Sequence, residues 1–200
     1  MDLSNDVIAI LYILATMIIV LLFAYALSKT KFFNVIENKK MNYVNCGIIL
    51  VSFGILSIVA TKMSASYDGA FINIRDLPVM IAGLIGGPIA GVGAGLIGGI
   101  ERYLEGGTVA VPCMIGTILS GIVGGIVWTL AGKKFPKIWM AAIAMLAVEC
   151  IHMLLVAYVS TSIAKNIAAP MIIFNVLGII LFGYLYHKYL VSEKNTETQR

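Results

Sequence analysis

Charged side chains are scarce in this sequence. They make up 12% of its 200 residues, whereas an average soluble domain carries about 25%. This shortage excludes an ordinary soluble domain. The formal net charge of +4 gives no prediction of nucleic-acid binding either, because the basic residues lie in short runs between apolar segments, where they set the orientation of a membrane protein.

Cysteine is scarce as well, and the motifs of known catalytic centres are missing. Cys46, Cys113 and Cys150 lie far apart without a C-x-x-C or histidine-rich spacing, so the sequence predicts neither a disulfide framework nor a metal site. No nucleophile elbow, phosphate-binding loop, zinc-protease helix or kinase motif occurs, and no polar segment is long enough for a catalytic domain. We expect no metal, no cofactor and no enzymatic activity in this chain.

Long apolar runs dominate what is present. Hydrophobic residues make up 60% of the chain, and its mean hydropathy is +0.97. Six apolar runs occur: Val7–Leu27, Val44–Ala60, Leu77–Ile100, Val109–Ala131, Ile138–Val159 and Ala168–Leu190. Acids and no base precede the first run, which is unlike a cleaved signal and indicates a permanent helix. We predict an all-α polytopic membrane helix bundle.

The basic residues favour seven membrane segments over six. With six crossings the lysines and arginines divide six against eight, which violates the positive-inside rule in either orientation. If Leu77–Ile100 instead forms two antiparallel helices joined at Gly86-Gly87-Pro88, they divide ten against four, with the N-terminus outside and the C-terminus in the cytoplasm. The cytoplasmic group is then Lys29, Lys31, Lys39, Lys40, Lys133, Lys134, Lys137, Lys188, Lys194 and Arg200, and the outer group is Lys62, Arg75, Arg102 and Lys165.

This hairpin contains an unusually short helix. Asp76–Gly86 would be about 16 Å long, too short to cross the membrane alone, so other helices must surround it. Glycine recurs every four residues along the hairpin, at Gly83, Gly87, Gly91, Gly95 and Gly99. That spacing is typical of close helix packing, and broken helices of this kind often line binding sites.

Three positions converge on the outer rim in the seven-segment topology. Arg75 precedes the short helix, Arg102 ends the next helix and Cys113 begins the one after it. Two guanidiniums among small residues suit a small carboxylate, because each can donate two parallel hydrogen bonds. Thr117 lies one turn from Cys113 and adds a hydroxyl. The pattern predicts a site for a small anion.

Both arginines also have a structural interpretation. Arg75 could pair with Asp76, and Arg102 with Glu101 or Glu105, while the charged groups reach the lipid headgroups. Asp76 is also expected to cap the N-terminus of the short helix. The sequence leaves the binding and structural interpretations open.

Glu149 and His152 form an ionisable pair in the middle of an apolar run. Their spacing places them on one helix face, where each could satisfy the other. Ionisable groups inside a membrane are costly and often functional, for example as proton-responsive groups. A structural hydrogen bond to Asn175 is the alternative, and both interpretations stay open.

One part of the sequence resembles a known family. The residues that carry the likeness are Asn73-Ile74-Arg75-Asp76-Leu77-Pro78, the run from Ala82 to Pro88, Gly91, Gly95, Glu101-Arg102-Tyr103 and Gly106-Gly107. They resemble the LytS/YhcK-type transmembrane receptor domain, the membrane sensor of LytS-like histidine kinases and of some diguanylate cyclases. The resemblance covers roughly Val44 to Leu190.

The resemblance implies a plasma-membrane receptor in two-component signal transduction. Its cue is extracytoplasmic, in some members a small carboxylate such as pyruvate, and other members are linked to cell-wall organisation and autolysis. Gly116 stands where a polar residue is expected one turn after Cys113. The expected partners are a small anion, membrane lipid, and either a second copy of the chain or a separate kinase or other output protein. The expected ligand-site residues are Asn73, Arg75, Asp76, Arg102, Cys113 and Thr117.

The sequence predicts three regions in the chain, and it also leaves a second function open. Residues 1–43 are predicted to form an N-terminal transmembrane helix with a basic cytoplasmic loop, residues 44–190 the receptor domain and residues 191–200 a cytoplasmic tail. The short-helix pattern is also similar to the S-components of energy-coupling-factor transporters, whose six-helix fold the receptor domain is thought to share. The alternative is therefore a solute-binding transporter subunit, although Val44–Ala60 lacks the Ala-x-x-x-Ala face usual in S-components.

Overall fold

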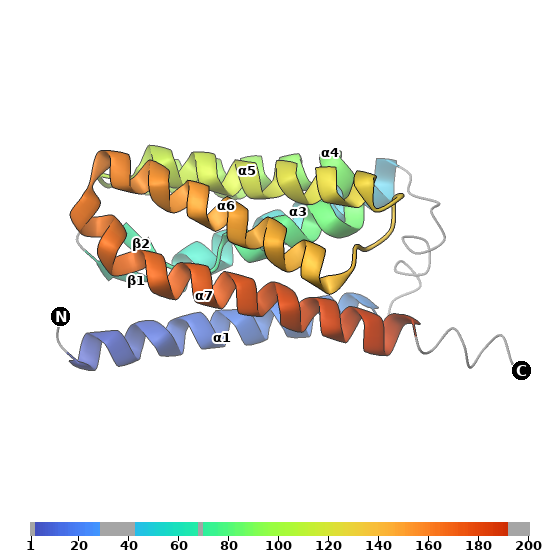
Figure 1. Ribbon diagram of the computed structural model, residues 1–200, viewed down its shortest axis with the longest axis horizontal. Helices are drawn as coiled ribbons and strands as arrows, with labels where there is room; N and C mark the ends of the chain where they lie inside the picture. The colour runs from blue at the N-terminus through green and yellow to red at the C-terminus, as the bar shows by residue number, and fades with distance from the viewer. Residues whose placement is uncertain (1–2, 29–42, 68–69, 192–200) are drawn as a thin grey trace, which may run out of the picture.

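The computed structural model describes residues 3–28, 43–67 and 70–191. The helices are α1 (Leu3–Ser28), α3 (Tyr43–Lys62), α4 (Asp76–Leu104), α5 (Ala110–Leu130), α6 (Ile138–Val159), α7 (Thr161–Leu185) and the π-helical turn η1 (Tyr186–Val191); the strands are β1 (Ala65–Tyr67) and β2 (Ala70–Ile72). The predicted tail and the basic residues at 29, 31, 39, 40, 194 and 200 lie outside the described residues. The helices run side by side as a bundle (Figure 1).

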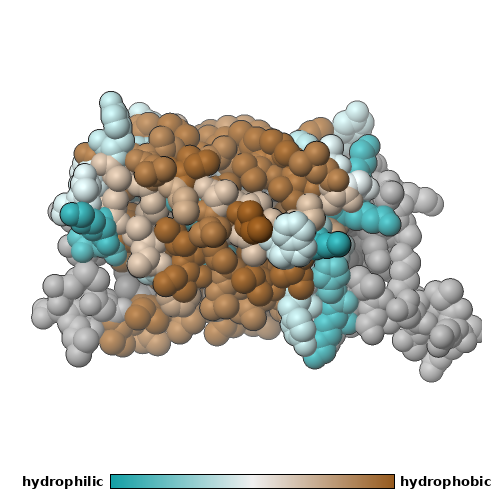
Figure 2. Space-filling view, viewed as in Figure 1, coloured by the Kyte–Doolittle hydropathy of each residue, from teal (hydrophilic) through white to brown (hydrophobic). Residues whose placement is uncertain are grey.

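The bundle has the dimensions and surface of a membrane protein. Among the described residues, five helices, α3 to α7, are long and apolar enough to cross a bilayer, and α1 adds a shorter apolar stretch, Ile10–Phe23. A broad hydrophobic band covers the visible face, and hydrophilic residues gather toward the two ends (Figure 2). The prediction of an all-helical polytopic membrane protein is confirmed, while the count of seven segments stays a prediction.

Helix α4 folds back on itself at Gly87. That residue has φ 78° and ψ −171°, a conformation that only glycine adopts without strain, and Pro88 follows it. The two arms are antiparallel, because an added Cβ on Gly91 would lie 2.8 Å from the Cα of Gly83, and one on Gly95 would lie 3.4 Å from the side chain of Val79. The reversal expected at Gly86-Gly87-Pro88 is therefore present.

The first arm of α4 is enclosed by protein. Every residue from Asp76 to Gly87 is buried, as expected for a helix too short to span a membrane alone. Helix α5 covers one side of this arm and approaches so closely that a Cβ on Gly83 would lie 2.6 Å from the backbone nitrogen of Gly125. A Cβ on Gly91 would lie 2.2 Å from the carbonyl oxygen of Gly121. Glycine is thus required for the contact between α4 and α5.

The other glycines of the row lie at the same contact. A Cβ on Gly95 would come within 3.0 Å of Ile118, and one on Gly99 within 3.1 Å of both Ile118 and Met114. Gly87 lies against the ring of Trp128, 2.7 Å from the position of its missing Cβ. All of these neighbours belong to α5, so the row of glycines forms one continuous packing face.

The connections divide between two ends of the bundle (Figure 1). The α5–α6 connection, which carries Lys133, Lys134 and Lys137, lies at the same end as the last turns of α7. The β1–β2 hairpin and the α6–α7 junction lie at the opposite end. The predicted topology also places the α5–α6 connection on one side of the membrane and the connections before α4 and α7 on the other.

Two local features differ from expectation. Only helices were expected, whereas β1 and β2 pair as an antiparallel hairpin, with Ala65 opposite Ile72. Helix α7 begins at Thr161 and not near Ala168, because its first turns carry Lys165 and Asn166 and therefore fall outside an apolar window. Ser160 caps this start by accepting a hydrogen bond from the backbone N–H of Ile163 at 3.4 Å.

Candidate functional site

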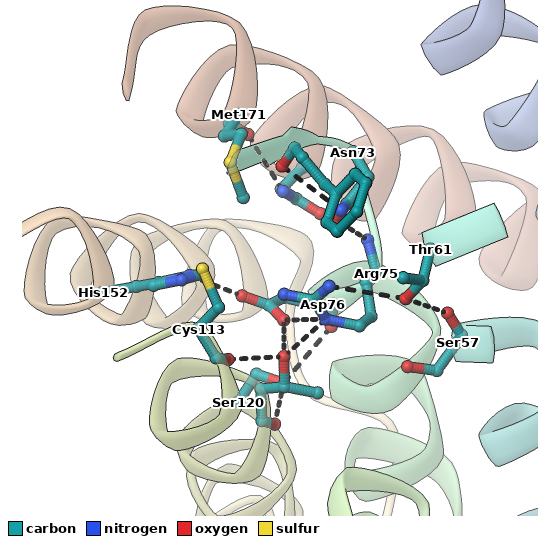
Figure 3. A network of polar contacts seen from close by, with 12 residues as sticks. Ser57, Thr61, Asn73, Arg75, Asp76, Cys113, Ser120, His152 and Met171 are labelled. Carbon is teal, nitrogen blue, oxygen red and sulfur yellow. Dashed lines mark hydrogen bonds and ion pairs between the residues drawn. The ribbon is translucent and has the colours of Figure 1, made fainter. Parts of the chain in front are cut away.

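A buried polar network lies where the first turn of α4 meets α5 and α6 (Figure 3). Arg75 immediately precedes α4 and Asp76 is its first residue, while Thr117 comes from α5 and His152 from α6. None of these side chains is more than 1% exposed. Arg75 and Thr117, which were expected to contribute to a ligand site, are therefore enclosed by protein.

Thr117 connects Arg75 to Asp76. The Nε of Arg75 donates to the Thr117 hydroxyl at 2.8 Å, and that hydroxyl donates to Oδ1 of Asp76 at 2.6 Å. The direct ion pair from Arg75 Nε to Asp76 Oδ1 is longer, at 3.9 Å. Hydrogen bonds to charged groups are stronger than neutral ones, so the hydroxyl is a central part of this network.

Asp76 was predicted to cap the N-terminus of the short helix, but it does not. The N-cap position belongs to Arg75, which has helical φ and ψ and makes no side-chain capping bond. The second carboxylate oxygen of Asp76, Oδ2, lies 2.9 Å from Nδ1 of His152. The carboxylate is thus committed to α5 and α6 through Thr117 and His152, and it links three helices.

Asn73 and Thr61 hold the segment before α4. The Asn73 side chain accepts from the backbone N–H of Arg75 at 3.1 Å and donates to the carbonyl of Phe71 at 3.3 Å. Nη1 of Arg75 donates to the Thr61 hydroxyl at 3.4 Å. Asn73 therefore shapes the backbone that presents Arg75.

Arg102, near the end of α4, is only partly satisfied. Its side chain is 0% exposed. Nη1 donates to the carbonyl of Gly106 at 2.6 Å, and the guanidinium lies 4.7 Å from the centre of the Phe71 ring. Its Nε and Nη2 atoms, however, are buried without a hydrogen-bond partner among the described residues.

The alternative in which Arg102 pairs with Glu101 or Glu105 is not observed among the described residues. Lys62, at the end of α3, takes both carboxylates, with 3.1 Å between its Nζ and Glu101 and a hydrogen bond to Glu105. The hydrogen bond from Lys62 lowers the pKa of the Glu105 carboxyl. Both acids thus pair with Lys62, and no salt bridge joins Arg102 to a carboxylate among the described residues.

Cys113 and Gly116 complete the wall on α5. Cys113 is 2% exposed, and its thiol lies beside both His152 and Arg102. Gly116 leaves room for the His152 ring, since a Cβ there would lie 2.4 Å from Cγ of His152. The absence of a larger side chain at position 116 thus lets the histidine reach Asp76.

Glu149 is buried beside this network without a partner. Its side chain is 0% exposed, and neither carboxylate oxygen has a hydrogen-bond partner within the part of the chain that the structure describes. Of the two interpretations left open, a hydrogen bond between Glu149 and His152 does not form: Nδ1 of the histidine lies against Asp76, and its Nε2 has no partner among the described residues. Asn175, the alternative partner, donates instead to the carbonyl of Met171 at 3.0 Å.

Three of these side chains could in principle hold a metal ion. Asp76, Glu149 and His152 each offer one ligand atom, and these atoms lie within 4.8 Å of one another. Carboxylate and imidazole donors suit a divalent transition metal. The guanidinium of Arg75, however, lies 3.9 Å from Asp76 and opposes a second cation by Coulomb repulsion.

Sequence reasoning missed one member of the site, Phe71, and one role, that of Asp76. Asp76 was among the expected site residues and was also expected to cap its own helix, but its bond to His152, 76 positions away, was not predicted. Phe71, which covers Arg102, lies in the hairpin that was not predicted. A signal existed for Asp76, whose position between Arg75 and the start of a buried helix allows its carboxylate to face inward.

Proteins with similar sequences are named as sensors. The chain is 32% identical over 200 residues to Sensor histidine kinase BtsS of Escherichia coli (strain K12), covering 94% of the chain and 36% of that protein. It is 30% identical over 202 residues to Sensor protein LytS of Bacillus cereus, covering 90% of the chain and 34% of the relative. The chain therefore spans about a third of the length of these relatives.

Two further results complete the comparison. No solved structure matches the chain. A family model described as 5TMR of 5TMR-LYT (5TM-5TMR_LYT) matches residues 30–189, which include every residue of the buried network. The chain belongs to this 5TMR-LYT family of transmembrane receptor regions.

Proposed function

We propose that this chain is the membrane-embedded sensor region of a LytS-type two-component system and that it binds a small extracytoplasmic carboxylate at Arg102. The observation that carries the proposal is the buried guanidinium of Arg102, whose Nε and Nη2 lack partners in the described chain. The sensor role is supported by the relatives, which are named as sensor histidine kinases and sensor proteins.

The free edge of Arg102 has the geometry of a carboxylate receptor. Nε and Nη2 lie side by side on one edge of the guanidinium, and their N–H bonds point in parallel at the two oxygens of a carboxylate. Leaving charged donors buried and unpaired costs several kcal/mol. A ligand carboxylate would remove that cost, whereas Gly106 and Phe71 already fix the rest of the side chain.

The other residues of the site then have distinct roles. Arg75 is already bonded to Thr117 and Thr61, so it contributes positive potential while Thr117 and Asp76 hold it in place. Asn73 fixes the backbone before α4. Cys113 lies between Arg102 and His152 and forms the wall of the site.

The signal would pass from this site to an output domain or partner in the cytoplasm. In this proposal the N-terminus is outside, the C-terminus is cytoplasmic, and the output comes either from a longer form of the chain acting as a dimer or from a separate kinase. The contact between α4 and α5 is built from glycines and lets the helices shift against each other at short range. A ligand drives such a shift only by binding one arrangement better than the other.

Thermal unfolding of the detergent-purified chain tests the proposal. The probes are acetate, lactate, pyruvate and 2-oxoglutarate, with riboflavin and thiamine as neutral or cationic vitamins. Specific binding raises stability by mass action, by about 2.7 kcal/mol when the ligand is at a hundred times its Kd. We expect a saturable shift with at least one carboxylate, and its loss in Arg102→Lys, which keeps the charge but not the two-pronged edge.

Lys165→Gln is the matched control, because it removes an exposed cation in the first turns of α7, at the same end of the bundle (Figure 1), and leaves Lys62 with its two acids. A shift that survives in Arg102→Lys, or that disappears equally in Lys165→Gln, contradicts specific binding at Arg102. A saturable shift with a vitamin alone would favour a transporter subunit of the S-component kind.

A further inference from the structure

The connection between α5 and α6 carries a group of exposed lysines that the carboxylate site does not use. Lys133, Lys134 and Lys137 lie within five positions of one another, and all three are exposed. Their side chains form no ion pair and no hydrogen bond with any residue that the structure describes. Positive charge therefore gathers at this end of the bundle without a counterion from the described chain.

The acids that could offset this charge lie elsewhere. The first turn of α6, which follows Lys137, contains no acidic residue. Glu101 and Glu105 pair with Lys62, which lies beside the β1–β2 hairpin at the opposite end of the bundle (Figure 1). The acids of the buried polar network are enclosed by protein. An anion at the three lysines would thus meet no carboxylate of the described residues.

The backbone that carries these lysines is fixed on both sides. At the end of α5, the backbone N–H of Lys133 donates to the carbonyl of Trp128 at 3.0 Å, which closes the helix with a tight turn. The ring of Phe135 stacks on Tyr186, with 4.4 Å between the ring centres, and Pro136 is buried. A ligand held by such a connection has less backbone to order than one held by a flexible tail.

Exposed apolar side chains flank the lysines. Leu130, the last residue of α5, is 76% exposed, and Trp139, in the first turn of α6, is 60% exposed. Helices α5 and α6 are long and apolar enough to cross a bilayer, so their ends lie where hydrocarbon gives way to headgroups. Tryptophan favours that depth, because its ring is apolar and its N–H is polar. The three lysines therefore lie at the level of the lipid headgroups.

We propose that Lys133, Lys134 and Lys137 form a binding site for the headgroup of an anionic phospholipid, whose acyl chains lie against Leu130 and Trp139. The negative headgroup complements the three positive charges, and the hydrocarbon chains continue along the apolar surface next to them. A soluble phosphate ion has only the first of these two features. The site is separate from the carboxylate site, which lies at the end of the bundle that carries the β1–β2 hairpin.

Phe135 connects this lipid site to the last helix. Its ring contacts Phe182 at 5.6 Å and Tyr186 at 4.4 Å between ring centres, and both partners belong to the last turns of α7 and the start of η1. A lipid that holds the α5–α6 connection therefore also secures the end of α7. We expect phosphatidylglycerol to raise the thermal stability of the detergent-purified chain by mass action, and phosphatidylcholine to raise it less.

Fluorescence quenching tests the proposal directly. The two tryptophans of the chain, Trp128 and Trp139, both lie at this end and report the lipid beside them. The full chain is reconstituted in phosphatidylcholine with increasing amounts of phosphatidylglycerol brominated near the top of its acyl chains, and brominated phosphatidylcholine is the reference. Roughly fivefold in affinity per lysine gives a preference for the anionic lipid on the order of a hundredfold at low salt, and sodium chloride should reduce it.

Three variants separate this site from the overall charge of the protein. Glutamine at positions 133, 134 and 137 together should lower the preference to near one, whereas arginine at the same positions keeps the charge and should keep the preference. Lys165→Gln removes an exposed cation at the opposite end and should also keep it. A preference that survives the three glutamines, or that disappears equally in Lys165→Gln, overturns the proposal. Absence of any preference in the wild type overturns it too, and leaves the lysines to an acidic protein partner.

Inorganic phosphate distinguishes a lipid site from a site for a soluble anion. Sodium phosphate should release the brominated phosphatidylglycerol no more than sodium chloride does at the same ionic strength, because the acyl chains contribute to binding. Greater release by phosphate would assign the three lysines to a soluble anion and would contradict the lipid proposal.

Discussion

Thr117→Val removes one hydroxyl from the centre of the buried network while keeping the shape of the side chain. In the wild type this hydroxyl accepts from Arg75 Nε at 2.8 Å and donates to Asp76 Oδ1 at 2.6 Å. After the substitution both ions lose a partner at a position that is 0% exposed. The direct distance of 3.9 Å between them is too long for a hydrogen bond to replace the lost pair.

The expected magnitude follows from these two bonds. Each hydrogen bond to a charged group contributes about 1.5–3 kcal/mol, so their combined loss should lower the free energy of unfolding by about 3–6 kcal/mol. Thr117→Ser keeps the hydroxyl and should cost much less, since it removes only a methyl group, worth roughly 1 kcal/mol. The measurement is reversible unfolding in mixed detergent, followed by circular dichroism.

Thr129→Val is the matched control for this prediction. The Thr129 hydroxyl makes a single hydrogen bond, to the carbonyl of Gly125 in its own helix at 2.9 Å. That carbonyl also accepts the backbone hydrogen bond of the helix, so Thr129→Val should lower the free energy of unfolding by less than about 1 kcal/mol. If Thr117→Val is no more destabilising than Thr129→Val, the hydroxyl does not carry the ionic network and our account of the site is wrong.

The remaining predictions concern glycines. Gly91→Ala should abolish the folded, monodisperse state in size-exclusion chromatography, because its Cβ would lie 2.2 Å from the Gly121 carbonyl oxygen. Gly47→Ala, whose Cβ would meet nothing within 4 Å, should be tolerated. Equal behaviour of the two variants would contradict the packing of α4 on α5. Gly116→Ser should displace the His152 ring, 2.4 Å from the new Cβ, and lower the thermal stability. The double variant with His152→Ala should be less destabilised than the sum of the single changes, and strict additivity would show that the two positions do not meet.

The architecture was predictable where it depends on composition and chain breaks. Apolar length predicted α3, α5 and α6 to within two residues of their ends, and Gly86-Gly87-Pro88 predicted the reversal, because that position requires a conformation which only glycine tolerates. The start of α7 and the β1–β2 hairpin were not predictable in this way. Both lie in polar or short segments, where tertiary contacts and capping outweigh hydropathy.

The candidate site was predictable in its members more than in its pairings. The topology placed Arg75, Arg102, Cys113 and Thr117 near one another, and Arg75 does bond to Thr117. Partner choice depends on distances of a few ångströms, which no spacing rule supplies. His152 therefore binds Asp76 and not Glu149, and Lys62 takes the acids that had been assigned to Arg102.

The enclosed first arm of α4 has a consequence for how the protein is made. Because every residue from Asp76 to Gly87 is covered by protein, this arm has no lipid-facing surface in the fold, and its polar start finds partners only on other helices. During synthesis this arm can reach its final packing only after α5 has been made, because α5 follows it in the chain and supplies both the glycine face and Thr117. A nascent chain that stops before α5 therefore exposes Arg75 and Asp76 unpaired, so quality-control proteases should recognise it as unfinished.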